Sequence, residues 1–267
     1  MDFCAENVTF ITAINDESVL KKNLLSSPLF SRIKVKNLIM QKDYISASQA
    51  YNAAIRRAET EFLIFVHQDI VLPQNWINDV NKAISILEDK KDNWGIIGCF
   101  GVDNIGIEHG YLFCTGNGRF ILEPFDYPQK VKTLDEIVLI LKKSSKLTFD
   151  EFLPHFHFYG TDICLQAAEK GMSCYAISAF CLHNSNQTTL FPSEFFAASD
   201  YIRKKWSKYL PIHTPCVSIG QSKAIFNIKY KFYRSLNYSI RKTFNKIDAP
   251  RKRVENVDLF LNRLLKK

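Results

Sequence analysis

Apolar blocks and mixed apolar–polar segments alternate along the first hundred residues. Four short blocks have no helical period and are typical of strands buried on both faces: Val8–Ile14, Val35–Met40, Phe62–Val66 and Trp94–Val102. The segments between them place apolar residues at helical spacing: Ser18–Phe30, with Pro28 at its exit, Ser46–Ala58 and Gln74–Asp89. This alternation predicts an α/β domain with a mostly parallel central sheet flanked by helices.

The pattern loosens after Gly101. Residues 101–120 are rich in glycine and indicate loops and short hairpin strands. The segment Thr133–Ser145 fits either a helix or a strand. A helix is predicted from about Thr161 to Lys170, and it is followed by a strand that runs to His183.

Composition is ordinary for a globular protein, but charge is unevenly distributed. Residues 222–267 contain 13 Lys and Arg against 3 Asp and Glu, whereas the other 221 residues contain 22 against 24. We therefore expect two parts, a domain over residues 1–221 and a basic, amphipathic helical tail over residues 222–267. The near-neutral charge of the domain argues against nucleic acid as a partner.

Seven scattered cysteines without a C-x-x-C pair favour reduced thiols and a cytoplasmic location. The acidic N-terminus lacks the pattern of a signal peptide, and no apolar run is long enough to span a membrane.

Polar groups collect where predicted strands end. His67 and Asp69 follow a buried strand, and His183 follows another one far along the chain. Two residues at i and i+2 on an extended segment point to one side, so His67 and Asp69 can meet one ligand. Asp162 lies at the start of a predicted helix, with Thr161 as its candidate N-cap. For each cluster a plain structural role, as a turn residue, a cap or a packed histidine, stays open beside the functional one.

The order of these landmarks resembles the inverting GT-A-fold glycosyltransferases, broadly family 2, and most closely a bacterial glycosyltransferase-like branch. The similar stretches are "ITAINDE", "SQAYNAAIRRAETEFLIFV", "HQD", "YGTD" and "LHNS", and they span about Val8 to Ser185. The resemblance implies a GT-A fold, with a basic helical extension at the C-terminus of this chain. It also implies a metal-dependent enzyme that moves a sugar from a nucleotide-diphosphate donor to a saccharide or lipid-linked saccharide, as in bacterial surface polysaccharide synthesis.

The resemblance also implies roles for single residues. Asp69 and His183 would hold Mn²⁺ or Mg²⁺, and Asp162 would be the general base. The nucleotide-sugar would contact residues at the ends of the first strands and on the second helix: Asn15, Asp16, Glu17, Asp43, Asn52, His67 and Asp69. The acceptor would contact the residues around Asp162, namely His157, Tyr159, Gly160 and Thr161. His67 departs from the family, which usually has an acid there.

These roles agree with the chemistry of sugar transfer. A divalent ion can stabilise the charge of the leaving diphosphate, and an aspartate can take the proton of the attacking hydroxyl. Two other classes stay open: a nucleotidyltransferase, although the glycine- and basic-rich phosphate loop is missing after the first strand, and a degenerate domain that only binds a partner.

The tail has its own two alternatives. Apolar residues recur on one helical face at Ile225, Phe232, Leu236, Ile240, Phe244 and Ile247, with basic residues between them. Such a helix suits an anionic membrane surface, which would place the protein on the inner face of the membrane. A helix packed on the catalytic domain or on a second subunit explains the same pattern. The sequence leaves the oligomeric state open.

Overall fold

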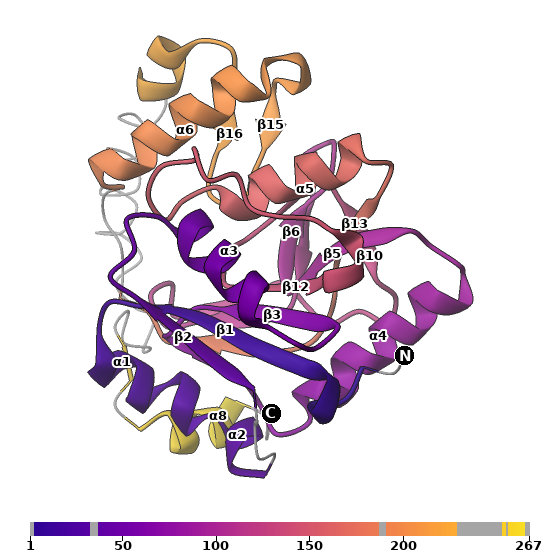
Figure 1. The fold of residues 1–267 in the computed structure, drawn as a ribbon. Helices are drawn as coiled ribbons and strands as arrows, with labels where there is room; N and C mark the ends of the chain where they lie inside the picture. Colours follow the sequence, from indigo (N-terminus) through magenta and orange to yellow (C-terminus); the bar gives the residue numbers. More distant parts are fainter. Residues whose placement is uncertain (1–2, 33–36, 187–190, 229–252, 255, 265–267) are drawn as a thin grey trace.

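The computed structural model describes residues 3–32, 37–186, 191–228, 253–254 and 256–264 (Figure 1). Its centre is a seven-stranded sheet in the order β10-β13-β5-β12-β3-β1-β2. The strands are β1 (Val8–Ile14), β2 (Leu38–Lys42), β3 (Phe62–Val66), β5 (Trp94–Gly98), β10 (Gln129–Val131), β12 (Val138–Lys142) and β13 (Ser173–Ala176). β12 and β10 pair antiparallel with their neighbours, and the other five strands run parallel. The predicted mostly parallel α/β sheet is confirmed.

Helices cover both faces of the sheet (Figure 1). α3 (Ala47–Arg57) and α5 (Tyr159–Glu169) lie on one face, with α6 (Ser193–Lys205) outside α5. α1 (Glu17–Lys22), α2 (Pro28–Arg32) and α4 (Trp76–Asp89) lie on the other face. Single turns of 3-10 helix occur at Ala5–Asn7, Leu24–Ser26, Lys143–Ser145 and Ser207–Tyr209. No helix among the described residues is long and apolar enough to cross a membrane.

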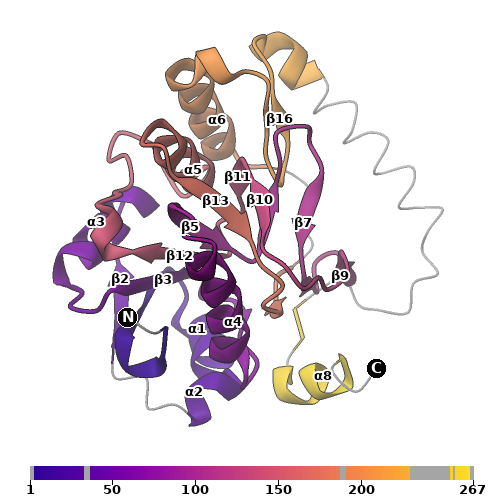
Figure 2. The same cartoon turned by 90° about the vertical axis from the view of Figure 1, so that its right-hand side faces the viewer.

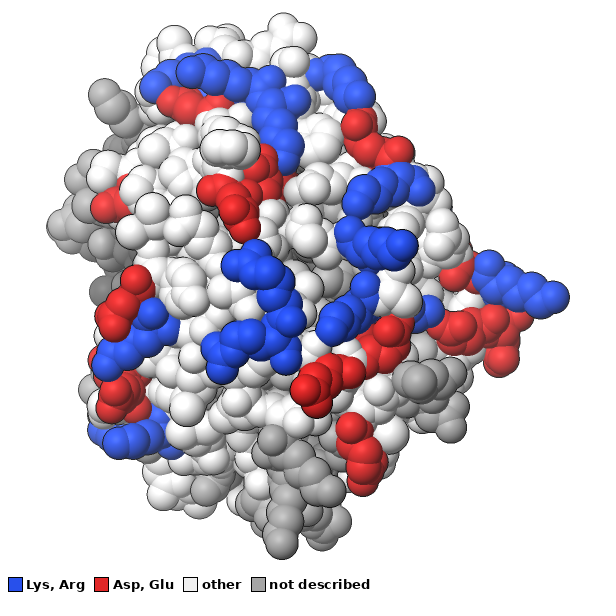
Figure 3. Space-filling view, in the orientation of Figure 1, with Lys and Arg blue, Asp and Glu red and all other residues white. Residues whose placement is uncertain are grey.

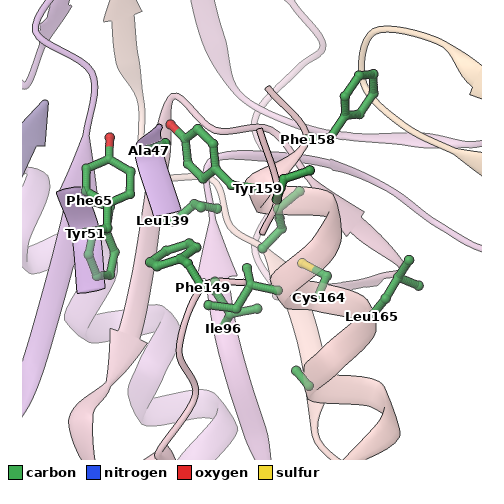
Figure 4. Packing of buried hydrophobic residues seen from close by; sticks show 14 of the residues in the cluster. Ala47, Tyr51, Phe65, Ile96, Leu139, Phe149, Phe158, Tyr159, Cys164 and Leu165 are labelled. Carbon is green, nitrogen blue, oxygen red and sulfur yellow. The ribbon is translucent and has the colours of Figure 1, made fainter. Parts of the chain in front are cut away.

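Neighbouring residues of each central strand belong to opposite cores. On β3, Phe65 packs in the α3/α5 core while Ile64 packs in the α1/α4 core, and Leu139 and Ile140 of β12 divide in the same way. In the first core, the rings of Tyr51, Phe149 and Tyr159 gather between α3, α5 and the sheet (Figure 4), with centroids 5.3–5.8 Å apart. A strand that is buried on both faces needs no alternation of apolar and polar residues, which explains the continuous apolar runs in the sequence.

Three smaller sheets lie beside the main one. The first has the order β11 (Thr133–Leu134), β6 (Phe100–Val102) and β7 (Glu108–Gly110). The second has the order β4 (Ile70–Val71), β14 (Cys181–His183), β8 (Leu112–Cys114) and β9 (Arg119–Ile121). The third is the hairpin of β15 (Ile212–His213) and β16 (Ser218–Ile219). The second sheet matters most for function, because it carries His183 next to the end of β3.

Several predicted boundaries were wrong. Pro28 begins α2 rather than ending a helix, which agrees with the preference of proline for the first helical turn. The run Trp94–Val102 is two strands, β5 and β6, in different sheets, and the strand that was expected to reach His183 is likewise divided into β13 and β14. β2 begins at Leu38 in the described residues, and Val35 lies outside them. The ambiguous segment Thr133–Ser145 forms β11, β12 and one 3-10 turn.

The C-terminal segment returns to the domain. α8 (Val257–Leu264) lies near the second sheet (Figure 2). Its Val257 and Leu261 side chains are buried in one cluster with Val71, Phe113 and Leu182 of that sheet and with Phe180, which directly precedes β14. The predicted amphipathic helix over Ile225–Ile247 falls mostly outside the described residues. On the face in Figure 3, basic and acidic side chains lie side by side, in agreement with the near-neutral charge of residues 1–221.

Candidate metal and active site

His67, Asp69 and His183 come together at the carboxyl edge of the central sheet. β4 directly follows Asp69 and pairs with β14, so that Ile70 lies opposite His183. The backbone N–H of Asn184 donates to the carbonyl of Asp69 over 2.9 Å, which fixes the two segments together. One ligand atom from each of the three side chains lies within 4.8 Å of the other two, and Nε2 of His183 is 3.4 Å from Oδ2 of Asp69.

Residues 67–69 form a tight turn rather than the extended segment expected from the sequence. The N–H of Ile70 donates to the carbonyl of His67 over 3.2 Å. The turn still presents the side chains of His67 and Asp69 to His183. The three residues therefore come together as expected, but through a turn and not through an extended segment.

Within the cluster, Asp69 and His183 stabilise each other's charged forms. Burial acts to raise the pKa of Asp69, but the charge of His183 and its hydrogen bond, with smaller contributions from His67 and Arg253, hold that pKa well below its usual range. Burial acts to lower the pKa of His183, yet Asp69 and then Cys114 raise it well above the ordinary value. For His67, burial outweighs Asp69 and lowers the pKa, so its imidazole is neutral near pH 7. A neutral imidazole is the form that binds metals, so a bound metal would replace the proton that Asp69 favours on His183.

The donor set fits a divalent transition ion. Two imidazoles and one carboxylate suit Mn²⁺, Fe²⁺ or Zn²⁺ better than Mg²⁺, which prefers oxygen ligands. All three side chains are half-buried, so part of the cluster faces solvent and a substrate could supply further ligands. Cys114, with Sγ 4.0 Å from Nδ1 of His183, orients that ring from behind.

The loop after β1 is tied to the same edge by Gln68. The side-chain oxygen of Gln68 accepts from the N–H groups of Asn15 and Asp16, each over 3.2 Å, and its amide donates to Oδ1 of Asn15. Asp43 follows β2, the parallel neighbour of β1, in a left-handed conformation with a φ of 63°. The ends of β2, β1 and β3 therefore form one continuous edge, which is the usual ligand-binding edge of a parallel sheet.

Three predicted nucleotide-sugar contacts already have other partners. Asp16 caps α1 by accepting from Ser18 and Val19. Glu17 pairs with Lys42 on the exposed surface, and their mutual hydrogen bond lowers the pKa of Glu17. Asn52 is buried and brackets Phe149, donating to its carbonyl over 2.8 Å and accepting from its N–H over 2.9 Å. Through these contacts, Asn52 holds the loop before α5 in place.

Asp162 has a buried side chain that is bonded to residues of α5 and of the α6 region. Its side chain is 1% exposed, and its oxygens accept 2.7 Å hydrogen bonds from Lys205 and Trp206 of the α6 region and from Gln166. Burial raises its pKa, although Lys205, Trp206 and Gln166 oppose the rise. A general base needs a free lone pair that reaches the acceptor. The geometry instead favours a structural role, in which Asp162 joins α5 to α6.

The predicted acceptor residues divide in two. Tyr159 reaches the cluster, because its hydroxyl lies 2.8 Å from Nε2 of His67. His157 packs edge-on against Phe195 with centroids 5.4 Å apart. α5 begins at Tyr159, with Phe158 at the N-cap position, so Thr161 lies inside the first turn and the predicted cap was wrong. Gly160 is sterically required, since a Cβ there would lie 2.7 Å from the carbonyl oxygen of Leu134.

Arg253 is a site residue that the sequence did not single out. Its guanidinium lies 3.6 Å from Oδ2 of Asp69, and its Nε donates to the carbonyl of Asn184 over 2.9 Å. Val254 pairs with the Asn184 side chain in both directions, over 2.8 and 3.0 Å. Within a basic tail one arginine is not distinguishable by pattern, and only the returning chain shows which one reaches the cluster.

Residues 9–195 match a family model described as "Glycosyltransferase like family". A protein of Fuscovulum blasticum named "ATP synthase subunits region ORF 6" is 26% identical over 162 residues, which are 58% of this chain and 63% of that protein. This chain thus spans less than two thirds of that relative's length.

Among solved structures, TarS residues 1–349 of S. aureus has a TM-score of 0.45 at 13% identity, over 74% of this chain and 65% of that one. The mannosyltransferase PcManGT of Pyrobaculum calidifontis, in complex with GDP-Man and Mn²⁺, has a TM-score of 0.47 at 10% identity, over 97% of this chain and 80% of that one. Likenesses of this size carry no functional argument.

Proposed function

Since the chain belongs to the glycosyltransferase-like family, we propose that it transfers a sugar from a nucleotide-diphosphate donor to a hydroxyl of a saccharide or lipid-linked acceptor. The observation that carries this proposal is the His67–Asp69–His183 cluster at the carboxyl edge of the sheet. The edge offers a place for each part of a donor: the loop of Asn15 and Asp16 and residue Asp43 for the nucleoside, and the cluster for the diphosphate.

Of the two ions expected from the sequence, Mn²⁺ and Mg²⁺, we propose Mn²⁺, because the donor set is richer in nitrogen than Mg²⁺ prefers. When bound, it would offset the negative charge that develops on the leaving diphosphate. Arg253, already beside Asp69, would add a second positive charge on the same side. Tyr159 fixes the ring of His67, and Cys114 fixes that of His183.

We infer that the transfer inverts the anomeric centre, in a single displacement. The acceptor hydroxyl attacks C1 of the sugar while the C1–O bond to the diphosphate breaks, and the bonding pair leaves with the diphosphate oxygen. A group on the acceptor side must take the hydroxyl proton. Surface polysaccharide synthesis stays the setting that the family resemblance suggests.

The test is binding and hydrolysis of UDP-, GDP- and dTDP-sugars with and without Mn²⁺. Asp69→Asn and His183→Ala should each weaken Mn²⁺-dependent donor binding by at least ~10–100-fold, the range for a supporting contact of a metal ligand. Leu259→Ala, an exposed change on α8, is the matched control. Equal donor binding by the wild type and both variants would contradict the metal role. Transfer of a nucleotidyl group instead of a sugar would identify the alternative enzyme class.

A further inference from the structure

We propose that Glu136, and not Asp162, is the general base of this reaction. The proposal rests on the proposed function and names the residue that takes the acceptor's proton. When the hydroxyl oxygen bonds to C1 of the sugar and the diphosphate leaves with the electron pair of the broken C1–O bond, the hydroxyl proton moves to the carboxylate of Glu136.

Glu136 lies beside the metal cluster. It sits between β11 and β12, and the carbonyl of the next residue, Ile137, accepts from the N–H of His67 over 3.0 Å. The hydroxyl of Tyr159 connects the same two segments, since it lies 2.8 Å from Nε2 of His67 and donates to the carbonyl of Glu136 over 3.3 Å. These contacts place the backbone of Glu136 beside the cluster.

The start of α5 leaves room for the Glu136 side chain. A Cβ on Gly160 would lie 3.4 Å from Cγ of Glu136, so the missing side chain of Gly160 lets the carboxylate approach the helix. Nearby backbone N–H groups, of Glu136 itself and then of Gly160 and Phe158, act to lower its pKa. Glu136 as a whole residue is half-buried, in contrast to the 1% exposure of Asp162.

The surroundings adjust Glu136 for proton transfer near neutral pH. Burial first and the charge of Asp135 second raise its pKa to about 8. Several titratable groups interact electrostatically with the Glu136 carboxylate. They are Asp135 on the same loop, Tyr51 on α3, Tyr159 and Cys164 on α5, and Cys216 in the β15–β16 turn. A base is most effective when its pKa lies near the working pH.

Asp135 is a weaker candidate for the same role. Its Oδ1 accepts from the N–H of Ile137 over 3.1 Å, so the carboxylate folds back on its own loop. This contact stabilises the turn between β11 and β12 and thereby positions Glu136.

The experiment compares wild type, Glu136→Gln and Glu136→Asp in the Mn²⁺-dependent release of nucleoside diphosphate, with water as acceptor and with whichever of the UDP-, GDP- and dTDP-sugars binds. Glu136→Gln keeps shape but cannot take a proton, so release should fall by roughly 10²–10⁴-fold. The donor Kd should stay within about twofold, because the carboxylate acts on the acceptor side. Glu136→Asp should retain an intermediate rate. Glu169→Gln, the same change on an exposed carboxylate at the end of α5, should behave as wild type.

The pH profile separates a base from a structural residue. In wild type, kcat/KM should rise with pH up to about 8, as Glu136 becomes ionised, and this limb should vanish in Glu136→Gln. Release by Glu136→Gln at nearly the wild-type rate, a retained limb, or a parallel loss of donor affinity would each overturn the role of Glu136. A wild-type protein that neither binds nor cleaves any of these donors would overturn the proposed function itself, and the role of Glu136 with it.

Discussion

At the residue scale, Asp162 illustrates how a carboxylate at a helix start can be structural. Asp162→Ala would remove the acceptor of the buried Trp206 indole and one partner of Lys205, which keeps Asp150. We expect this variant to lose about 2–4 kcal/mol of unfolding free energy, measured with urea, because a buried donor is left unpaired. Asp162→Asn keeps an acceptor oxygen and should lose much less. Folded Asp162→Asn with at least a hundredfold slower transfer would restore Asp162 as the base.

Glu136 makes a second prediction, about stability. Its pKa is about 8 in the folded protein against an ordinary 4.5, so the folded state holds the proton more tightly than the unfolded state. The native protein therefore loses stability as the pH rises from about 4.5 to about 8. Glu136→Gln, which cannot ionise, should be more stable than wild type at pH 9 and nearly equal at pH 4. Urea unfolding at both pH values measures this difference.

The matched control has the opposite sign. Lys208 and Tyr209 lower the pKa of Glu169, so its ionised form favours the folded state, and Glu169→Gln should gain nothing at pH 9. A Glu136→Gln variant that is less stable than wild type at pH 9 would contradict the raised pKa.

Among single residues, the sequence predicted those whose position follows from strand ends. His67, Asp69 and His183 each follow a buried strand, and this was enough to expect convergence. Glu136 and Arg253 could not be found in this way. The position of the Glu136 side chain depends on Gly160, which lies next to it in the fold but not in the sequence. The contact of Arg253 with Asp69 depends on where the C-terminal segment packs on the domain. Such contacts between distant segments leave no periodic signal in a single sequence.

At the scale of elements, α8 couples the end of the chain to the cluster. Leu261 is 2% exposed and anchors α8 on the second sheet, whereas Leu259 on the same helix is 50% exposed. Leu261→Asp should undock α8 and release Arg253 from Asp69. Because a cation beside Asp69 competes with the metal, Mn²⁺ affinity without donor should rise by about 2–5-fold, the equivalent of one partly exposed ion pair. Calorimetric titration with Mn²⁺ measures this change.

Two variants control this prediction. Arg253→Ala should raise Mn²⁺ affinity in the same way without undocking α8, and Leu259→Asp should leave it unchanged. Unaltered Mn²⁺ affinity in both Leu261→Asp and Arg253→Ala would show that Arg253 does not act on Asp69.

The sequence predicted the central helices and strands well, since amphipathic α4 and the apolar β1 and β3 have clear patterns. The prediction from the sequence was wrong where one continuous apolar run forms strands in two different sheets. Trp94–Val102 has no polar break, so no local pattern indicates that Phe100–Val102 leaves the central sheet to pair with β7 and β11.

At the scale of the whole molecule, the basic excess of residues 222–267 still predicts attachment to an anionic surface. Full-length protein should pellet with anionic vesicles at low salt and be released at high salt, since each basic residue near the surface contributes about 1 kcal/mol. Changing Arg241, Lys242 and Lys246 to Glu should abolish pelleting. Neutral vesicles are the control. Binding that depends neither on salt nor on these substitutions would contradict electrostatic attachment.

Truncation is a poor way to test the tail. Removing residues 222–267 would uncover Val71, Phe113, Phe180 and Leu182, which α8 covers. Loss of binding in such a fragment would therefore mix unfolding with lost charge, and charge changes in the full chain keep the two apart.

The place of β12 between β3 and β5 has a consequence for the protein's synthesis. Both neighbours leave the ribosome well before the strand that joins them, and until then each presents an unpaired edge of wholly apolar residues. Such edges invite pairing with other chains, and the other edge of β5 pairs only with β13, so the nascent protein should depend on chaperones until residue 176 has emerged. β12, which joins β3 to β5, also brings Glu136 to its position. A chain that ends before β12 thus lacks both the strand that joins the sheet and the proposed base.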